Sequence, residues 1–146
     1  MLKNSQLKPN QIKEGFIFNE VNCQNIVDTE GCFRLTDLFP KVWDKIKSNN
    51  LSPKDKYGKL ERIEIGDITI ANSYSRYKEN HEVSTKTLEK EKNLLIKNIK
   101  ALDKWAKSLN LPVYLPIQIR DNRINGEWDD IIQNLQDTTQ VELISL

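Results

Sequence analysis

Residues 84–110 read STKTLEKEKNLLIKNIKALDKWAKSLN, and this stretch decides the fold. At 100° per residue its apolar side chains fall on one stripe, which predicts a long amphipathic helix. Ser84 or Thr85 caps its start, and Asn110 with Pro112 beyond it marks its end. At 1.5 Å per residue the helix is about 40 Å long, so we expect it to organise the fold. The stripe comprises Leu88, Leu95, Ile99, Leu102, Ala106 and Leu109, widened by Leu94, Ala101 and Trp105.

The opposite face of this helix is rich in lysine. The segment holds seven lysines and three acids, a net charge of +4. Evenly spaced ammonium groups can follow a phosphate backbone and release its counterions, so this face is a candidate surface for nucleic acid or another partner. A lysine-rich face is also the usual way to solvate a helix, and the sequence leaves both interpretations open. The candidate binding residues are Arg76, Tyr77, Lys86, Lys90, Lys97, Lys100, Lys104 and Lys107.

Residues 62–71 carry the clearest hairpin signal. Gly66-Asp67 suits a two-residue turn, because glycine supplies the positive φ that a twisted hairpin needs. With this turn Ile65 pairs with Ile68 and Ile63 with Ile70, which places all four isoleucines on one face. The turn chemistry and the side-chain period therefore predict the same register.

The other elements are shorter. Residues 15–21 and 32–35 resemble short strands, Thr36 starts a helix over 37–48, and a polar connector runs over 72–83. In the strand predicted over 113–119, Pro116 has no N–H for a ladder, so we expect an edge or a bulge there. The expected fold is α+β: a small antiparallel sheet packed on the long helix 84–110. Its parts are the hairpin 62–71, strands 113–119 and 141–145, and shorter helices 37–48 and 126–135.

Length and composition indicate one globular domain. Residues 1–12 are polar and are expected to form a flexible arm, with a single domain over 13–146. The sequence has neither eighteen consecutive apolar residues nor the apolar core of a signal peptide, so we expect a cytoplasmic protein. Cys23 and Cys32 are then expected to be free thiols. The segment 120–146 has a net charge of −4, and it either neutralises the lysine-rich helix or forms a second patch.

The motifs of common enzymes are missing from this sequence. His81 is its one histidine and lies in a polar stretch, and no glycine-rich phosphate loop is present. Glu127, Asp129 and Asp130 lie close together near Asp121, but acids at a helix start are ordinary. We therefore predict no catalytic residue, metal ligand or cofactor.

The sequence thus favours a non-enzymatic binding or regulatory protein that acts through protein–protein contacts, such as an inhibitor, immunity protein or accessory factor of bacteria or phage. One alternative is a nucleic-acid-binding protein that uses the lysine-rich face of helix 84–110. Another is a metal-dependent hydrolase or nuclease that uses His81 or the carboxylates near Trp128. A protein partner is expected, a membrane is not, and the oligomeric state, including a homodimer, stays open.

Overall fold

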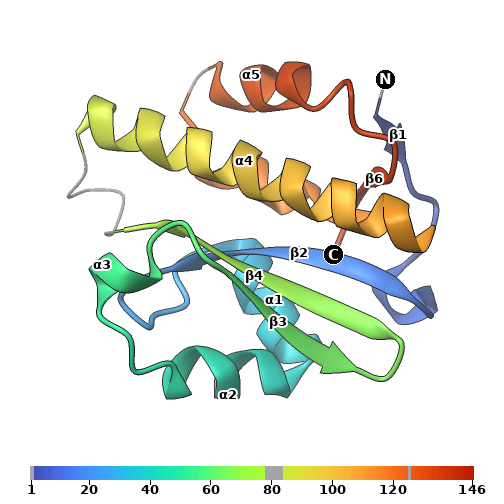
Figure 1. The fold of residues 1–146 in the computed structure, drawn as a ribbon, viewed down its shortest axis with the longest axis horizontal. Coiled ribbons are helices and arrows are strands. Elements are labelled where there is room, and N and C mark those ends of the chain that lie inside the picture. Colours follow the sequence, from blue (N-terminus) through green and yellow to red (C-terminus); the bar gives the residue numbers. More distant parts are fainter. Residues whose placement is uncertain (1, 78–83, 125) are drawn as a thin grey trace.

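A six-stranded sheet lies between two layers of helices in the computed structural model, which describes residues 2–77, 84–124 and 126–146. The strand order is β1-β6-β5-β2-β4-β3. Helices α4 and α5 cover one face of the sheet and α1 and α2 the other (Figure 1). The strands are β1 (Lys3–Asn4), β2 (Gly15–Asn22), β3 (Leu60–Ile65), β4 (Ile68–Arg76), β5 (Val113–Pro116) and β6 (Val141–Ile144). The α-helices are α1 (Glu30–Leu38), α2 (Pro40–Ser48), α3 (Pro53–Lys56), α4 (Thr85–Leu109) and α5 (Glu127–Asn134).

The sheet is mostly parallel, which corrects the predicted small antiparallel sheet. Four strand pairs, β1–β6, β6–β5, β5–β2 and β2–β4, are parallel, and β3–β4 is antiparallel. All eight residues of β2 are buried, because helices cover both faces of the sheet. Parallel neighbours need long crossovers, and the helices between the strands supply them. The fold is therefore a mixed α/β fold with a six-stranded sheet.

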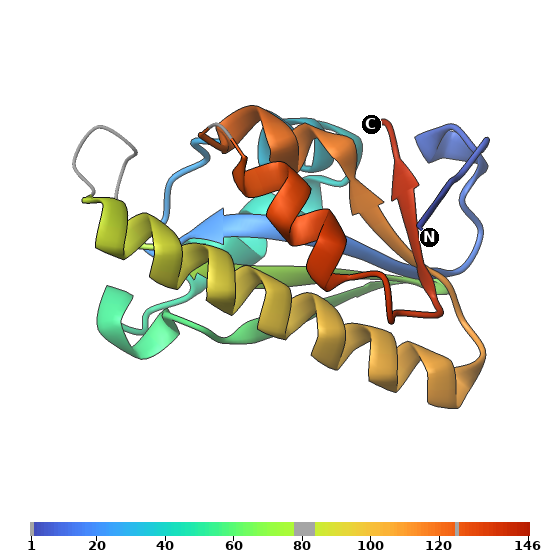
Figure 2. The ribbon, with the colours of Figure 1, turned by 90° about the horizontal axis from the view of Figure 1, so that it is seen from above.

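The long helix is confirmed. Ser84 caps α4 by accepting a hydrogen bond from the N–H of Thr87 (3.2 Å), and Asn110 ends it in the left-handed conformation (φ 54°). Leu95, Ile99, Leu102 and Ala106 are buried against the sheet as predicted, whereas Leu109 is 50% exposed. Figure 2 shows α5 lying across the same face of the sheet beside α4.

The hairpin register is also confirmed. Ile65 pairs with Ile68 and Ile63 with Ile70, and these isoleucines belong to the core beneath α1 and α2. The second strand is longer than predicted, because residues 72–76, expected in a polar connector, continue β4 to Arg76. Their side chains are buried, and the connector prediction was wrong for this part.

Three shorter predictions fail, at a proline or at a helix cap that sequence reasoning missed. The segment 32–35 is helical, and residues 37–48 are divided between α1 and α2. Thr29 caps α1 by accepting from the N–H of Cys32 (3.1 Å), and Pro40 begins α2 because its missing N–H costs nothing there. The strand predicted over 113–119 ends at Pro116, inside the sheet, and continues as the 3₁₀ helix η3 (Ile117–Asn122).

The C-terminal predictions hold: α5 covers 127–134, and β6 covers 141–144. Within the segment predicted as a flexible arm, β1 pairs with β6, the 3₁₀ helix η1 (Pro9–Gln11) follows, and Leu2 and Ile12 are buried. Cys23 and Cys32 are both free thiols. In the described part of the chain no helix has the length and apolar character to cross a bilayer.

Candidate functional site

The topology of the sheet predicts a ligand crevice at the carboxyl ends of β2 and β5. These strands are parallel neighbours, but the chain leaves β2 toward α1 on one face and leaves β5 toward α5 on the other. Adjacent loops that diverge in this way open a crevice at the sheet edge, where ligands of open α/β sheets usually bind. The end of β4, next to β2, borders the same place.

Arg76, the last residue of β4, lies at this edge of the sheet, opposite Asn22 of β2. Its side chain is 1% exposed, and its Nη2 and Nε donate to the two carboxylate oxygens of Asp28 at 2.9 and 3.3 Å. Asn22, at the end of β2, donates to the same carboxylate (2.9 Å). Burial alone would lower the pKa of Arg76, but the hydrogen bonds that it donates to Asp28 and the charges of Glu20 and Asp28 raise this pKa above its ordinary value. The guanidinium therefore stays charged inside the protein.

A second buried arginine approaches β2 from the other side. Arg123, just after η3, donates from Nη2 to the Glu20 carboxylate, and the two side chains are 2% and 1% exposed. The other oxygen of Glu20 and the Nε of Arg123 are buried, and neither has a hydrogen-bond partner among the described residues. The amide nitrogen of nearby Asn122 has none there either. Buried polar atoms of this kind call for a water or a ligand.

Glu91 of α4 adds a third carboxylate to the cluster. It is 1% exposed, and its Oε1 accepts the backbone N–H of Tyr77 at 2.7 Å. Burial raises the pKa of Glu91, while the hydrogen bond from Tyr77 and the charge of Arg76 lower it less strongly. A carboxyl with a raised pKa keeps its proton to a higher pH than a free glutamic acid does, a property that general acids and bases use.

The start of α1 faces the same crevice. The helix follows Asp28 directly, so the free N–H groups of its first turn lie at this edge of the sheet. Gly31 packs against η3, where an added Cβ would make an ordinary contact with the Cβ of Gln118 at 3.6 Å. Two arginines, three acids and a helix N-terminus thus lie together at this edge of the sheet among the described residues.

The binding residues predicted from the sequence lie in two separate places, at the end of β4 and along α4. Arg76 and Tyr77 reach the crevice, although Arg76 is buried rather than exposed, and the ring of Tyr77 packs edge-on against Tyr57 at 5.0 Å. Lys100 pairs with Asp137 (3.5 Å), and the ammonium of Lys90 lies over the ring of Tyr57. Whether the helix binds a partner stays a prediction. The exposed residues on its outer face are Lys86, Lys90, Lys97, Lys104 and Lys107.

The acidic segment partly neutralises the lysine-rich helix. Lys92 is 7% exposed and contacts Asp130 at 2.5 Å as well as Glu89 at 3.0 Å. Glu127 accepts the N–H of Ile124 (3.0 Å), an ordinary role for an acid at a helix start. No group of three acids, cysteines or histidines suited to a metal occurs among the residues described, and His81 lies outside them.

Sequence reasoning missed Glu20, Asp28, Glu91 and Arg123. A signal was present in β2, where Asn19, Glu20 and Asn22 interrupt an apolar strand just before it ends. Polar residues at the carboxyl end of a buried parallel strand point to a site, but only once the strand is known to be parallel.

The architecture is that of macrodomains. No family model matches the sequence, and no curated protein matches it significantly. The macrodomain of Mycobacterium tuberculosis DarG superposes with a TM-score of 0.62 at 13% identity, over 100% of this chain and 98% of that one. The macrodomain of Thermus aquaticus DarG gives 0.62 at 15% identity, over 99% and 97%. A macrodomain protein from Streptomyces coelicolor gives 0.62 at 13%, over 93% and 91%.

This likeness corrects the functional prediction. At such low identity it establishes the fold, and macrodomains are usually binders of ADP-ribose and can be hydrolases. The hypothesis of a non-enzymatic regulator that acts through protein–protein contacts was therefore wrong. It rested on missing motifs, whereas the crevice is assembled from residues far apart in the sequence.

Proposed function

We propose that this chain binds ADP-ribose in the crevice between the carboxyl ends of β2 and β5. Two facts support the proposal: the fold is shared with macrodomains over the whole chain, and the strand order changes direction between β2 and β5, where open parallel sheets usually hold ligands. A cytoplasmic location belongs to the same proposal and is supported by the free thiols of Cys23 and Cys32.

The observation that carries the proposal is that Arg76 and Arg123 both lie close enough to the buried carboxyl of Glu91 for their charges to lower its pKa. A guanidinium offers a planar set of donors that fits phosphate oxygens, and ADP-ribose contains a diphosphate. In the structure Asp28 and Glu20 hold these two arginines. We propose that the diphosphate takes over one or both guanidinium groups, with the first turn of α1 adding N–H donors.

The charge balance of the cluster predicts that ligand binding depends on pH. Two arginines face three acids, the buried Glu20 and Glu91 and the partly exposed Asp28, so a dianionic ligand adds negative charge to a site that already has more acids than cations. The ligand then raises the pKa of Glu91 beyond the increase that burial causes. Binding should therefore take up protons, and the affinity should increase as the pH falls.

Isothermal titration calorimetry of the full chain with ADP-ribose tests the proposal. We expect saturable binding that weakens about tenfold in Arg76→Lys and in Arg123→Lys, since lysine keeps the charge but not the planar fork. Arg34→Lys is the matched control, because Arg34 is exposed and lies one helical turn beyond its partner Glu30, the first residue of α1. Absence of saturation at millimolar ligand, or equal affinity in all variants, would reject the site.

The buried carboxyl of Glu91 supports a second candidate function, the hydrolysis of an ADP-ribosyl bond. A carboxyl whose pKa is raised by burial can donate a proton to a leaving group. The assay is the release of free ADP-ribose from an ADP-ribosylated protein by wild type and Glu91→Gln. We expect release that declines as the pH rises and is lost in Glu91→Gln; an unchanged rate in this variant would exclude the role.

A further inference from the structure

The outer side of β3 is an open sheet edge. In the sheet order β3 is the terminal strand. The two-residue turn makes Ile65 and Ile68 a hydrogen-bonded pair, and every second residue of β3 before it, Ile63 and Glu61, forms the next hydrogen-bonded pairs with β4. In an antiparallel ladder such residues bond to the neighbouring strand, and those between them direct their N–H and C=O groups outward. The backbone of Arg62 and Glu64 therefore faces away from β4. Within the described chain no strand pairs with it.

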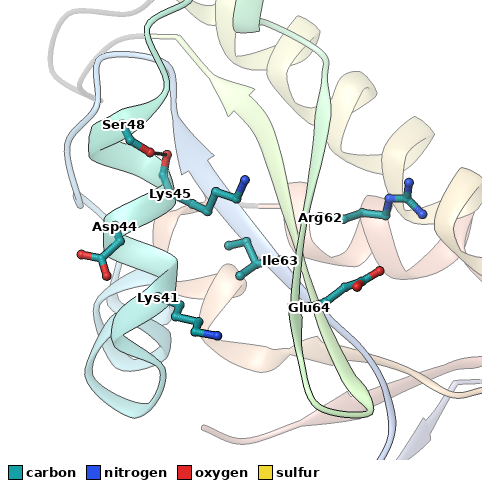
Figure 3. A pocket seen from close by; sticks show the side chains of 7 residues that line it. All are labelled: Lys41, Asp44, Lys45, Ser48, Arg62, Ile63 and Glu64. Carbon is teal, nitrogen blue, oxygen red and sulfur yellow. Dashed lines mark hydrogen bonds between the residues drawn. The ribbon is translucent and has the colours of Figure 1, made fainter.

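A groove of about 510 Å³ lies beside this open edge, between β3 and α2. Figure 3 shows Lys41 and Lys45 extending from α2 toward β3, while the Asp44 carboxylate turns away from the strand. Asp44 pairs instead with Lys47 at 3.5 Å. The Arg62 guanidinium lies on the other face of the sheet, over the ring of Trp105 at 4.7 Å. The helical wall of the groove is consequently basic, and its floor is Ile63.

The spacing of the two lysines matches a strand. Lys41 and Lys45 are one helical turn apart, about 6 Å along the axis of α2. Alternate residues of an extended strand are about 6.6 Å apart and point to the same face. Acidic side chains at alternate positions of a strand added to β3 would therefore meet the two ammonium groups in register.

A second copy of this chain fits the edge less well. A twofold pairing centred on Ile63 would place Arg62 opposite Glu64 of the other copy, which is favourable. The same operation would bring the two α2 helices together with Lys41 and Lys45 of both copies between them. Four ammonium groups in one groove repel each other, whereas an acidic strand neutralises them.

We propose that an extended peptide with acidic residues at alternate positions binds as a seventh strand along β3, under the lysines of α2. Backbone hydrogen bonds to Arg62 and Glu64 supply the pairing, and Lys41 and Lys45 select the acidic side chains. This surface is separate from the crevice between β2 and β5, so the proposal goes beyond ADP-ribose binding and stands or fails independently of it.

Fluorescence anisotropy with the full chain tests the charge selection. The probe is a labelled seven-residue peptide that alternates valine with glutamate, and the comparison peptide carries glutamine in place of glutamate. We expect saturable binding of the glutamate peptide, weakened about tenfold in Lys41→Glu/Lys45→Glu. Lys47→Glu/Lys54→Glu is the matched control, with the same net charge on residues outside the groove. Equal binding of both peptides, or equal loss in both double variants, overturns the proposal.

A proline substitution separates strand pairing from simple charge attraction. In Glu64→Pro the lost N–H is one that faces outward, so the pairing with β4 is retained, and a thermal melt checks this. This variant also makes the groove more positive, so attraction alone predicts tighter binding. Strand addition predicts a loss of at least about tenfold, with Glu64→Gln retaining affinity. Tighter binding in Glu64→Pro, or a dimer of the chain alone that Glu64→Pro abolishes, contradicts the peptide as occupant.

Discussion

Replacing Arg123 with methionine should destabilise this protein severely, because it leaves a buried carboxylate without its cation. Glu20 is 2% exposed as a whole residue, and one of its oxygens is already without a partner among the described residues. Removing one member of a buried ion pair costs about 3–5 kcal/mol. For a domain of this size that corresponds to a melting temperature lower by roughly 6–20 °C.

Urea unfolding followed by tryptophan fluorescence measures the effect. The double variant Glu20→Gln/Arg123→Met should recover most of the lost stability, since no isolated charge remains in the core. Arg34→Met is the control: its pair with Glu30 is 44% and 48% exposed and should contribute less than about 1 kcal/mol. The reasoning is refuted if Arg123→Met costs no more than Arg34→Met, or if the double variant is as unstable as Arg123→Met.

Three further predictions concern single residues. Burial raises the pKa of Glu91, so its contribution to stability is present below the pKa of the unfolded chain and is lost as the pH rises through the folded pKa. Glu91→Gln should therefore gain stability relative to wild type between pH 4.5 and pH 8; a constant difference in unfolding free energy across this range would count against it. Gly15→Ala should lower the free energy of unfolding in urea by about 2–4 kcal/mol, because φ is +105° and the new Cβ would lie 2.7 Å from the carbonyl oxygen of Pro112. The control Gly66→Ala has open space around the new Cβ and should lower it by about 1 kcal/mol. Thr29→Ala should cost about 1 kcal/mol through loss of the α1 cap, and Thr29→Ser should restore it, as chemical denaturation would show.

Local patterns predicted the elements whose geometry depends on neighbouring residues in the chain. The apolar stripe and the Ser84 cap defined α4, and the Gly66-Asp67 turn together with four isoleucines defined the β3–β4 register. In each case the period of the apolar side chains, 3.6 residues in the helix and two in the hairpin, agrees with a signal at the end of the element, a helix cap or a turn. The same reasoning failed at Thr36, because Thr29 is an equally good cap and lies seven residues earlier.

The candidate site was beyond such reasoning. Glu20, Arg123 and Glu91 come from β2, the segment after η3 and α4, and they meet because β2 and β5 are parallel neighbours. No period along the chain shows whether two strands pair in parallel. Arg76 illustrates the consequence: beside Tyr77 it resembled an exposed basic residue, yet it is 1% exposed and bound to Asp28.

By itself the sequence determined where this chain is helical near its middle, where its hairpin turns, and which faces of those elements are apolar, since these properties arise from steric and hydrophobic preferences within one or two turns. Tertiary structure alone decided the strand order, the burial of four charged side chains at one edge of the sheet and the open basic edge beside β3. Such properties depend on which segments meet across the sheet, and that choice is made by the packing of the whole core.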